Sequence, residues 1–177
     1  MLTKSQKTNI ISDVKNLLKG SKILLFTDFT GISVEESKFL RRLVNDLGAK
    51  YKVIKKKLMR VAFENSQISF NPERFESQLG TIFSPKDISE VAGPVYKFFS
   101  EIEKKRFSAR GGSALGGKIL GAYDLEKGEF LEGDFVKKIG QLPSREIILG
   151  QLAGVLSAPL KMFMYVLDQK MKQTVEK

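Results

Sequence analysis

Eleven residues, Lys50–Arg60, form the segment of this chain whose composition points most directly to chemistry. They carry six positive charges and no negative charge. Tyr51 and Val53 alternate with lysines, which is the period of a half-buried strand, and the apolar residues of 58–62 then follow the period of a helix. Lys55–Lys57 are therefore predicted at a strand-to-helix junction, close to the N-terminus of the helix.

Lysines at a helix N-terminus are chemically informative because that end already carries a partial positive charge and unpaired N–H groups. Three lysines there are unfavourable unless an anion neutralises them, and a bound phosphate would do so. The whole chain has a net charge of +10 and a pI near 9.7, which favours a polyanionic partner. The alternative interpretation is a solvated lysine cluster, but placement and net charge together favour nucleic acid.

The composition excludes many kinds of active site. The sequence has no cysteine and no histidine, so it lacks thiolate chemistry, the commonest general base and the commonest metal ligand. We therefore expect no cofactor and no catalytic metal. Apolar runs such as 23–26 are far shorter than a membrane-spanning helix, and polar residues interrupt any signal-like segment at the start. These features predict a cytoplasmic protein without a membrane partner.

One glycine-rich loop offers an enzymatic alternative. Residues Gly112–Lys118 fit the first seven positions of a phosphate-binding P-loop, but Ile119 replaces the Ser or Thr that would bind Mg²⁺. A hairpin in which glycine supplies positive φ angles explains the segment better. Lys118, Arg110 and 104–106 could still contact a phosphate backbone. A nucleotide-dependent enzyme using this loop remains the alternative hypothesis.

The elements that must position these residues predict an α+β fold. The expected order is helix 3–19, strand 22–29, helix 33–47, the basic strand and helix, strand 78–84, helix 87–104 and a strand over 105–110. A Ser33–Glu36 capping box is expected to start the second of these helices. Gly93–Pro94 is expected to kink or break the helix over 87–104. This order predicts a split βαβ (ferredoxin-like) domain with extra helices. We expect this domain over 1–130, a connecting segment over 131–143 and a helical tail over 144–177.

The tail behaves differently from the rest of the chain. Ser144 is a candidate cap for a helix over 145–157, and Ser157–Pro159 is expected to break or restart it. Beyond the proline an apolar stripe follows helical spacing, formed by Leu160, Phe163, Met164, Leu167 and Met171. Its methionines favour a helix bound by another protein over docking on its own domain or lying on a membrane surface.

Several ordered motifs resemble one known family. The blocks Asp28–Ser33, Leu40–Leu43 and Tyr51–Leu58 resemble the Asp-aromatic-x-Gly turn, the Leu-Arg helix and the Lys-Val-Val-Lys-Asn-Thr-Leu block of the tenth protein of the bacterial large ribosomal subunit. Leu79–Thr81 is similar to that family's Gly-Pro-Thr strand entry. Leu142–Glu146 resembles its Leu-Pro-Ser-Arg/Lys-Glu junction, and an Ala-Pro step follows. The resemblance covers nearly the whole chain.

The resemblance implies a non-catalytic, ribosome-associated scaffold. Its N-terminal domain would bind large-subunit rRNA beside the eleventh large-subunit protein, and its C-terminal helix would hold dimers of the acidic stalk protein that recruits translational GTPases. The RNA-binding residues implied are Thr30, Gly31, Arg41, Arg42, Lys52, Lys55, Lys56, Lys57 and Arg60. The stalk-binding residues are those of the apolar stripe. A ribosome-assembly factor of the same family is a further alternative, which the tail argues against.

The chain departs from the family pattern in two places. Lys56 and Lys57 stand where the family has Asn and Thr, so a polar contact would become a contact of pure charge. The terminal helix also looks shorter than is usual in the family, lacking at least one repeat of its apolar pattern, and from Leu160 to Val175 it offers about 24 Å at 1.5 Å per residue. We therefore expect it to bind one or two stalk dimers.

Overall fold

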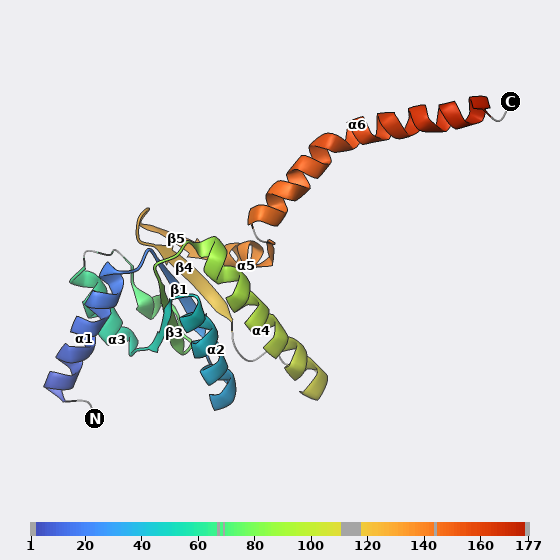
Figure 1. Ribbon diagram of the computed structural model, residues 1–177. Helices are drawn as coiled ribbons and strands as arrows, with labels where there is room; N and C mark the ends of the chain where they lie inside the picture. The colour runs from blue at the N-terminus through green and yellow to red at the C-terminus, as the bar shows by residue number, and fades with distance from the viewer. Residues whose placement is uncertain (1–2, 67, 69, 111–117, 144, 176–177) are drawn as a thin grey trace. The chain divides into compact units, whose positions relative to one another are not determined.

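The central strand β1 (Ile23–Asp28) is buried on both faces, which explains its continuous apolar sequence. In the computed structural model, which describes residues 3–66, 68, 70–110, 118–143 and 145–175, this strand lies at the middle of a five-stranded antiparallel sheet (Figure 1). The order is β2-β3-β1-β4-β5. The other strands are β2 (Lys50–Val53), β3 (Leu79–Ser84), β4 (Ile119–Asp124) and β5 (Glu129–Glu132).

The connections interlock as the sequence predicts for a split βαβ domain. The crossover from β1 to β2 passes over β3, and the crossover from β3 to β4 passes over β1. Strand β5 pairs antiparallel with β4, and the two strands form a hairpin. The predicted α+β class is confirmed, with the helices α1 (Lys4–Lys19), α2 (Val34–Asp46), α3 (Lys56–Glu64), α4 (Ile88–Arg110) and α5 (Gly133–Gln141), and a 3₁₀ turn η1 (Pro72–Arg74).

Two hydrophobic cores lie on opposite faces of the sheet. Ile23 and Leu25 of β1 belong to the core covered by α2, α4 and α5. Leu24 and Phe26 face the other way, into a core with residues of α1 and α3. Phe26 stacks on Phe70 with ring centroids 5.0 Å apart, so the chain between α3 and β3 closes this second core. The extra helices thus cover the face that the βαβ helices leave open.

Capping interactions start two of the helices where the sequence indicates. The Ser33 Oγ accepts from the Glu36 amide at 3.2 Å, and Glu36 Oε2 accepts from the Ser33 amide at 2.8 Å. Thr3 and Gln6 make the same reciprocal pair at α1. These bonds satisfy amides that have no partner within the helix.

Three local predictions are wrong. Residues 105–110 continue α4 and do not form a strand, in keeping with the strong helix formers that lead into them. Of the kink or break predicted at Gly93–Pro94, the break does not occur, because Val91, Ala92 and Val95 around the proline are buried and hold α4 on the sheet. The segment 131–143, expected to connect two units, contains the end of β5 and all of α5, whose Val136 is fully buried.

The chain divides into two units, Met1–Gln141 and Leu142–Lys177. The second contains one helix, α6 (Arg145–Val175), of 31 residues. The expected break at Ser157–Pro159 is wrong, because α6 continues through Pro159. The helix bends along its length in Figure 1, as expected where proline removes a backbone donor. The cap predicted at Ser144 lies outside the described residues.

Candidate nucleic-acid interface and partner-binding helix

Several of the predicted RNA-binding residues meet at one end of the sheet. The strands β1 and β2 finish there, and β3 and β4 begin there. Two backbone hydrogen bonds fasten the segments together, from Asp28 N to Lys118 O at 2.7 Å and from Phe29 N to Gln78 O at 3.3 Å. We call this region, formed by Thr30–Gly31, Lys55–Lys57 and Lys118, the basic end of the sheet.

The turn after β1 has a defined shape. Asp28 Oδ1 accepts from the Thr30 amide at 2.9 Å and also from the Thr30 hydroxyl. Gly31 has a φ angle of 77°, in the left-handed region that glycine enters without steric cost. Both Thr30 and Gly31 are exposed. The Asp28 carboxylate is therefore engaged in holding the turn, and the turn presents a compact polar surface beside the lysines.

The N-terminus of α3 is electropositive. Lys55 is its N-cap and makes no side-chain cap hydrogen bond, and the first turn, all of it described, contains no acidic residue. Lys55 and Lys57 are exposed. The predicted strand-to-helix junction is confirmed, and its amides and lysines point to an anion at this place. The buried face of α3 is Met59, Ala62 and Phe63, one position away from the 58, 61 and 62 pattern expected.

Three of the predicted RNA contacts also have partners within the protein. Lys56 Nζ donates to the carbonyl of Phe75, so its side chain fixes the segment that leads into β3. Arg60 pairs with Glu64 at 3.4 Å and with Glu73 at 3.1 Å. Lys52 pairs with Asp13 of α1 at 3.6 Å. The partners of Lys56 and Lys52 are far away in sequence, which is why spacing could not predict them.

The two arginines lie apart from Lys52. Arg41 and Arg42 are exposed on α2, which covers one face of the sheet, whereas Lys52 pairs with α1 on the opposite face. Arg41 is close enough to Tyr51 to act on its ionisation. The structure therefore places Thr30, Gly31, Lys55 and Lys57 at the same end of the sheet, and it sets Arg41, Arg42 and Lys52 on the flanking faces.

Tyr51 carries the one buried side-chain polar atom that lacks a hydrogen bond among the described residues. Its hydroxyl is buried and lies close to Gly80, where a Cβ atom would come within 2.2 Å of it. Burial raises the pKa of Tyr51, and this outweighs the lowering by the nearby Thr27 hydroxyl and the Arg41 guanidinium. The hydroxyl therefore stays neutral, and glycine at position 80 makes room for it.

Lys118 lies in a context unlike that of a P-loop. A P-loop connects a strand to a helix, whereas Lys118 immediately precedes β4. Residues 111–117 lie outside the described part of the chain. The lysine itself is exposed at the basic end of the sheet, where it adds positive charge to that of Lys55 and Lys57.

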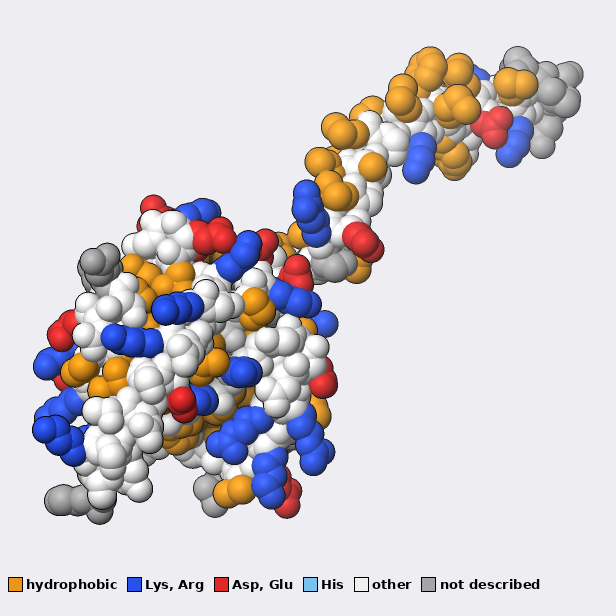
Figure 2. Space-filling view, turned by 60° about the vertical axis from the view of Figure 1, so that its left-hand side comes forward, with side chains coloured by type: hydrophobic (Ala, Val, Ile, Leu, Met, Phe, Trp, Pro, Cys, Tyr) orange, Lys and Arg blue, Asp and Glu red, His pale blue; other side chains and the backbone are white. Residues whose placement is uncertain are grey.

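The predicted partner-binding stripe is exposed on α6. The side chains of Leu160, Phe163, Met164, Leu167 and Met171 are between 47% and 70% exposed. The exposed apolar surface extends beyond this stripe, since Leu149, Leu156 and Met162 are exposed as well. Figure 2 shows the contrast, with apolar side chains gathered along α6 and Lys and Arg side chains scattered over the domain.

By length and composition alone, α6 could also cross a membrane. Over Arg145–Lys172 the mean hydropathy of its most apolar window is 1.6, and none of that window is buried in the structure. The expectation that every apolar segment is far too short therefore does not hold for this helix. A helix that another protein covers on several sides has the same composition, so hydropathy does not distinguish the two cases.

Comparison with known proteins identifies the family. A family model described as ribosomal protein L10 matches residues 2–100, and one described as the ribosomal protein uL10 C-terminal region matches residues 142–173. The chain belongs to the ribosomal protein L10 family. The first match contains β1 to β3 and most of α4, and the second contains nearly all of α6, so the L10 family pattern covers both units.

Curated relatives in the L10 family match the chain from end to end. Proteins named large ribosomal subunit protein uL10 are 27% identical over 175 residues in Wolinella succinogenes, covering 99% of each chain, and 30% identical over 163 residues in Lactobacillus johnsonii, covering 91% of this chain and 90% of the relative. The Thermotoga neapolitana protein of that name is 26% identical over 179 residues, covering 99% of this chain and 93% of its own.

Proposed function

We propose that this protein is a non-catalytic constituent of the large ribosomal subunit that binds large-subunit rRNA through its domain and acidic stalk-protein dimers through α6. The observation that carries the proposal is the exposure of apolar side chains along α6, a helix that the L10 family pattern includes. A helix of this composition needs a partner to cover it. The domain has no such surface of comparable extent among its described residues.

The RNA contact is assigned to the basic end of the sheet. Lys55, Lys57 and Lys118 are exposed there, the N-terminus of α3 adds its unpaired backbone amides, and the Thr30–Gly31 turn lies at the same end of the sheet. These groups bind phosphate through charge and through backbone N–H donors. Arg41, Arg42 and Lys52 extend the contact onto the flanking faces. Lys56 and Arg60 have internal partners, so we assign them mainly to shaping the surface.

The stalk contact is assigned to both halves of α6. Its 31 residues span about 46 Å at 1.5 Å per residue, and exposed apolar residues occur before and after Pro159. The bend at the proline divides this surface into two segments. We propose one or two stalk dimers on it, and a location in the cytoplasm on ribosomes, beside the eleventh large-subunit protein.

Co-purification from cells tests the proposal as a whole. The full chain should be recovered with large ribosomal subunits and with a small, acidic, dimeric protein. Recovery of the acidic protein without ribosomal particles would contradict the rRNA part. Recovery only with immature particles would favour the assembly-factor alternative, and a yield of three dimers per chain would contradict the proposed number.

Salt dependence tests the RNA part separately. Binding to a large-subunit rRNA fragment should weaken steeply with salt, because each neutralised phosphate releases counterions. Lys55→Gln combined with Lys57→Gln should reduce the slope of log K against log salt by about two and lower affinity at physiological salt. Lys127→Gln, in the β4–β5 turn at the other end of the sheet, is the matched control and should leave the slope unchanged. An equal effect of the two variants would contradict the assignment.

The enzymatic alternative has little support. Lys118 leads into a strand where a P-loop lysine leads into a helix. A thermal-shift assay with ATP and GTP distinguishes the two functions, since a bound nucleotide raises stability by mass action. Stabilisation that Lys118→Ala abolishes would establish nucleotide binding and overturn the non-catalytic assignment.

A further inference from the structure

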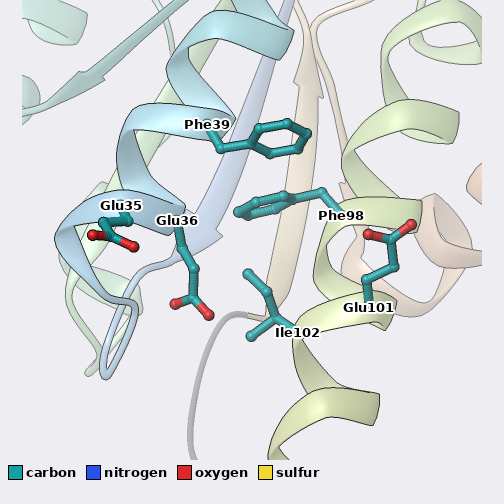
Figure 3. Close-up of a pocket in the computed structure, with 6 residues that line it drawn as sticks. All are labelled: Glu35, Glu36, Phe39, Phe98, Glu101 and Ile102. Atoms are coloured by element: carbon teal, nitrogen blue, oxygen red, sulfur yellow. The ribbon is translucent and has the colours of Figure 1, made fainter.

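A hollow between α2 and α4 is the part of the domain that the proposed function leaves unexplained. It has a volume of 260 Å³ and is lined by Glu35, Glu36, Phe39, Phe98, Glu101 and Ile102. We call it the acidic groove. Figure 3 shows the rings of Phe39 from α2 and Phe98 from α4 lying one above the other, with the Glu36 side chain extending toward Ile102.

The floor of the groove is aromatic and partly open. The Phe39 and Phe98 rings stack with centroids 5.9 Å apart and an interplanar angle of 22°. Phe98 is buried, whereas the Phe39 side chain is 55% exposed. A large aromatic side chain that is well ordered by stacking and still open to solvent provides apolar area and a π face to a partner.

The rim of the groove is acidic in a strongly basic chain. Glu36 already caps α2 through Oε2. Among the residues that the structure describes, neither Glu35 nor Glu101 has an ion pair within the chain. Carboxylates around this floor repel phosphate, so the groove does not suit the RNA that the basic end of the sheet suits.

We infer that the acidic groove binds an arginine-bearing segment of a partner protein. A guanidinium stacks on an aromatic face and pairs with carboxylates at the same time, which a lysine ammonium does less well. The aliphatic part of the arginine side chain packs on Ile102 and on the edge of Phe98. Glu35 of α2 and Glu101 of α4 flank the groove (Figure 3), and their negative charge favours a cationic occupant over an anionic one. The inference goes beyond rRNA and stalk binding because it uses a different surface.

A pair of synthetic peptides tests the inference on the full chain. One peptide carries two arginines among leucines, and the matched peptide carries neutral citrulline in place of each arginine. The reporter is the methyl signal of Ile102 in NMR spectra of methyl-labelled protein. We expect the arginine peptide to shift this signal to saturation and the citrulline peptide to bind at least about five-fold more weakly.

Substitutions show whether the groove itself is responsible. Glu35→Gln with Glu101→Gln should weaken arginine-peptide binding by about three- to ten-fold and reduce its salt dependence. Phe39→Ala should weaken binding as well, and its exposed position allows the domain to fold. Glu129→Gln, an exposed acidic residue of β5, is the matched control and should change nothing.

Four results would overturn the inference. They are equal binding of the two peptides, unchanged affinity in the Glu35/Glu101 variant, an Ile102 shift produced by an rRNA fragment in the absence of peptide, and a shift that depends on protein concentration alone. The last would assign the groove to a second copy of this chain. An Ile102 shift produced by rRNA would move the RNA contact toward the groove, whereas the other three results leave the rRNA and stalk proposals untouched, so the two proposals can be distinguished.

Discussion

The domain and α6 use the same kinds of apolar residue in opposite ways. Phe26, Phe63 and Phe83 in the domain are at most 2% exposed, whereas Phe163 in α6 is 63% exposed. In the domain most apolar side chains find a facing element, because the sheet offers two faces and the helices α1 to α5 cover them. In α6 no facing element exists within its own unit, which the structure describes from residue 145 to residue 175. The domain therefore buries its own apolar side chains, while α6 leaves its apolar side chains exposed.

The comparison also extends to charge. The basic end of the sheet gathers lysines around backbone amides, whereas the charged residues of α6 are few and lie among apolar ones. The first arrangement suits a polyanion, whose binding is governed by salt. The second suits a protein whose own apolar surface needs covering, so its binding is governed by buried area.

Removing core volume should produce the largest effect. Phe63→Ala is expected to lower the free energy of unfolding by about 3–5 kcal/mol, because Phe63 is fully buried among the residues of α3 and β1. Phe163→Ala is the matched change on α6 and should alter it by less than about 0.5 kcal/mol. Urea unfolding followed by near-ultraviolet circular dichroism measures both. An equal decrease in the free energy of unfolding in the two variants would contradict the conclusion that the domain buries its apolar residues and α6 does not.

Introducing charged residues into the apolar stripe of α6 should weaken binding of the stalk protein without lowering the stability of the domain. Phe163→Asp combined with Leu167→Asp is expected to weaken stalk-protein binding by about 100-fold or more, since burying each side chain contributes about 1.5–3 kcal/mol. Isothermal titration calorimetry with the dimeric acidic protein measures this effect. Gln169→Asp adds a charge without removing apolar area and should cost far less. Retained binding in the double variant would show that the half of α6 before Pro159 suffices and would contradict the contact proposed for the half after it.

The smallest expected effect is that of Tyr51 on the free energy of unfolding of the domain. The folded state keeps Tyr51 neutral above the pH of about 10 at which the unfolded chain ionises it, so the free energy of unfolding should fall as pH rises beyond that value. Tyr51→Phe removes this dependence and, at neutral pH, should leave stability unchanged or raise it by up to about 1 kcal/mol.

Urea unfolding at pH 7 and at pH 10 to 11 measures the Tyr51 effect. Tyr165→Phe on α6 is the control and should follow the unsubstituted protein at every pH, because Tyr165 is exposed. A loss of more than about 1 kcal/mol in Tyr51→Phe at neutral pH would mean that the hydroxyl has a hydrogen-bond partner after all.

Local signals in the sequence predicted the elements that have local causes. The Ser33–Glu36 capping box, the apolar run of β1 and the change of period at Lys55 each depend on residues within one turn or one strand, and each is confirmed. Errors arose where packing overrides local preference. Pro94 and Pro159 were expected to interrupt helices, yet both helices continue, at the cost of one backbone hydrogen bond each.

The sequence could not predict the contacts of the site that join residues far apart in the chain. The Lys56 side chain reaches the carbonyl of Phe75, and Arg60 reaches Glu73, so the sequence showed a run of lysines but not which of them have partners. The acidic groove was missed for the same reason. Phe39 and Phe98 are 59 positions apart, and neither is unusual within its own helix.

The sequence by itself determined the strongly basic charge, the absence of histidine and cysteine chemistry, the split βαβ order and an apolar C-terminal helix. These depend on composition and on periods of two and 3.6 residues, which need no tertiary contact to be seen. Only the tertiary structure decided that Lys55 and Lys57 lie at the same end of the sheet as the Thr30–Gly31 turn, that Lys56 and Arg60 are held by internal partners, and that two aromatic rings meet between α2 and α4. These arrangements depend on strand pairing, side-chain contacts and helix packing between separate segments, which are set by burial over the whole domain.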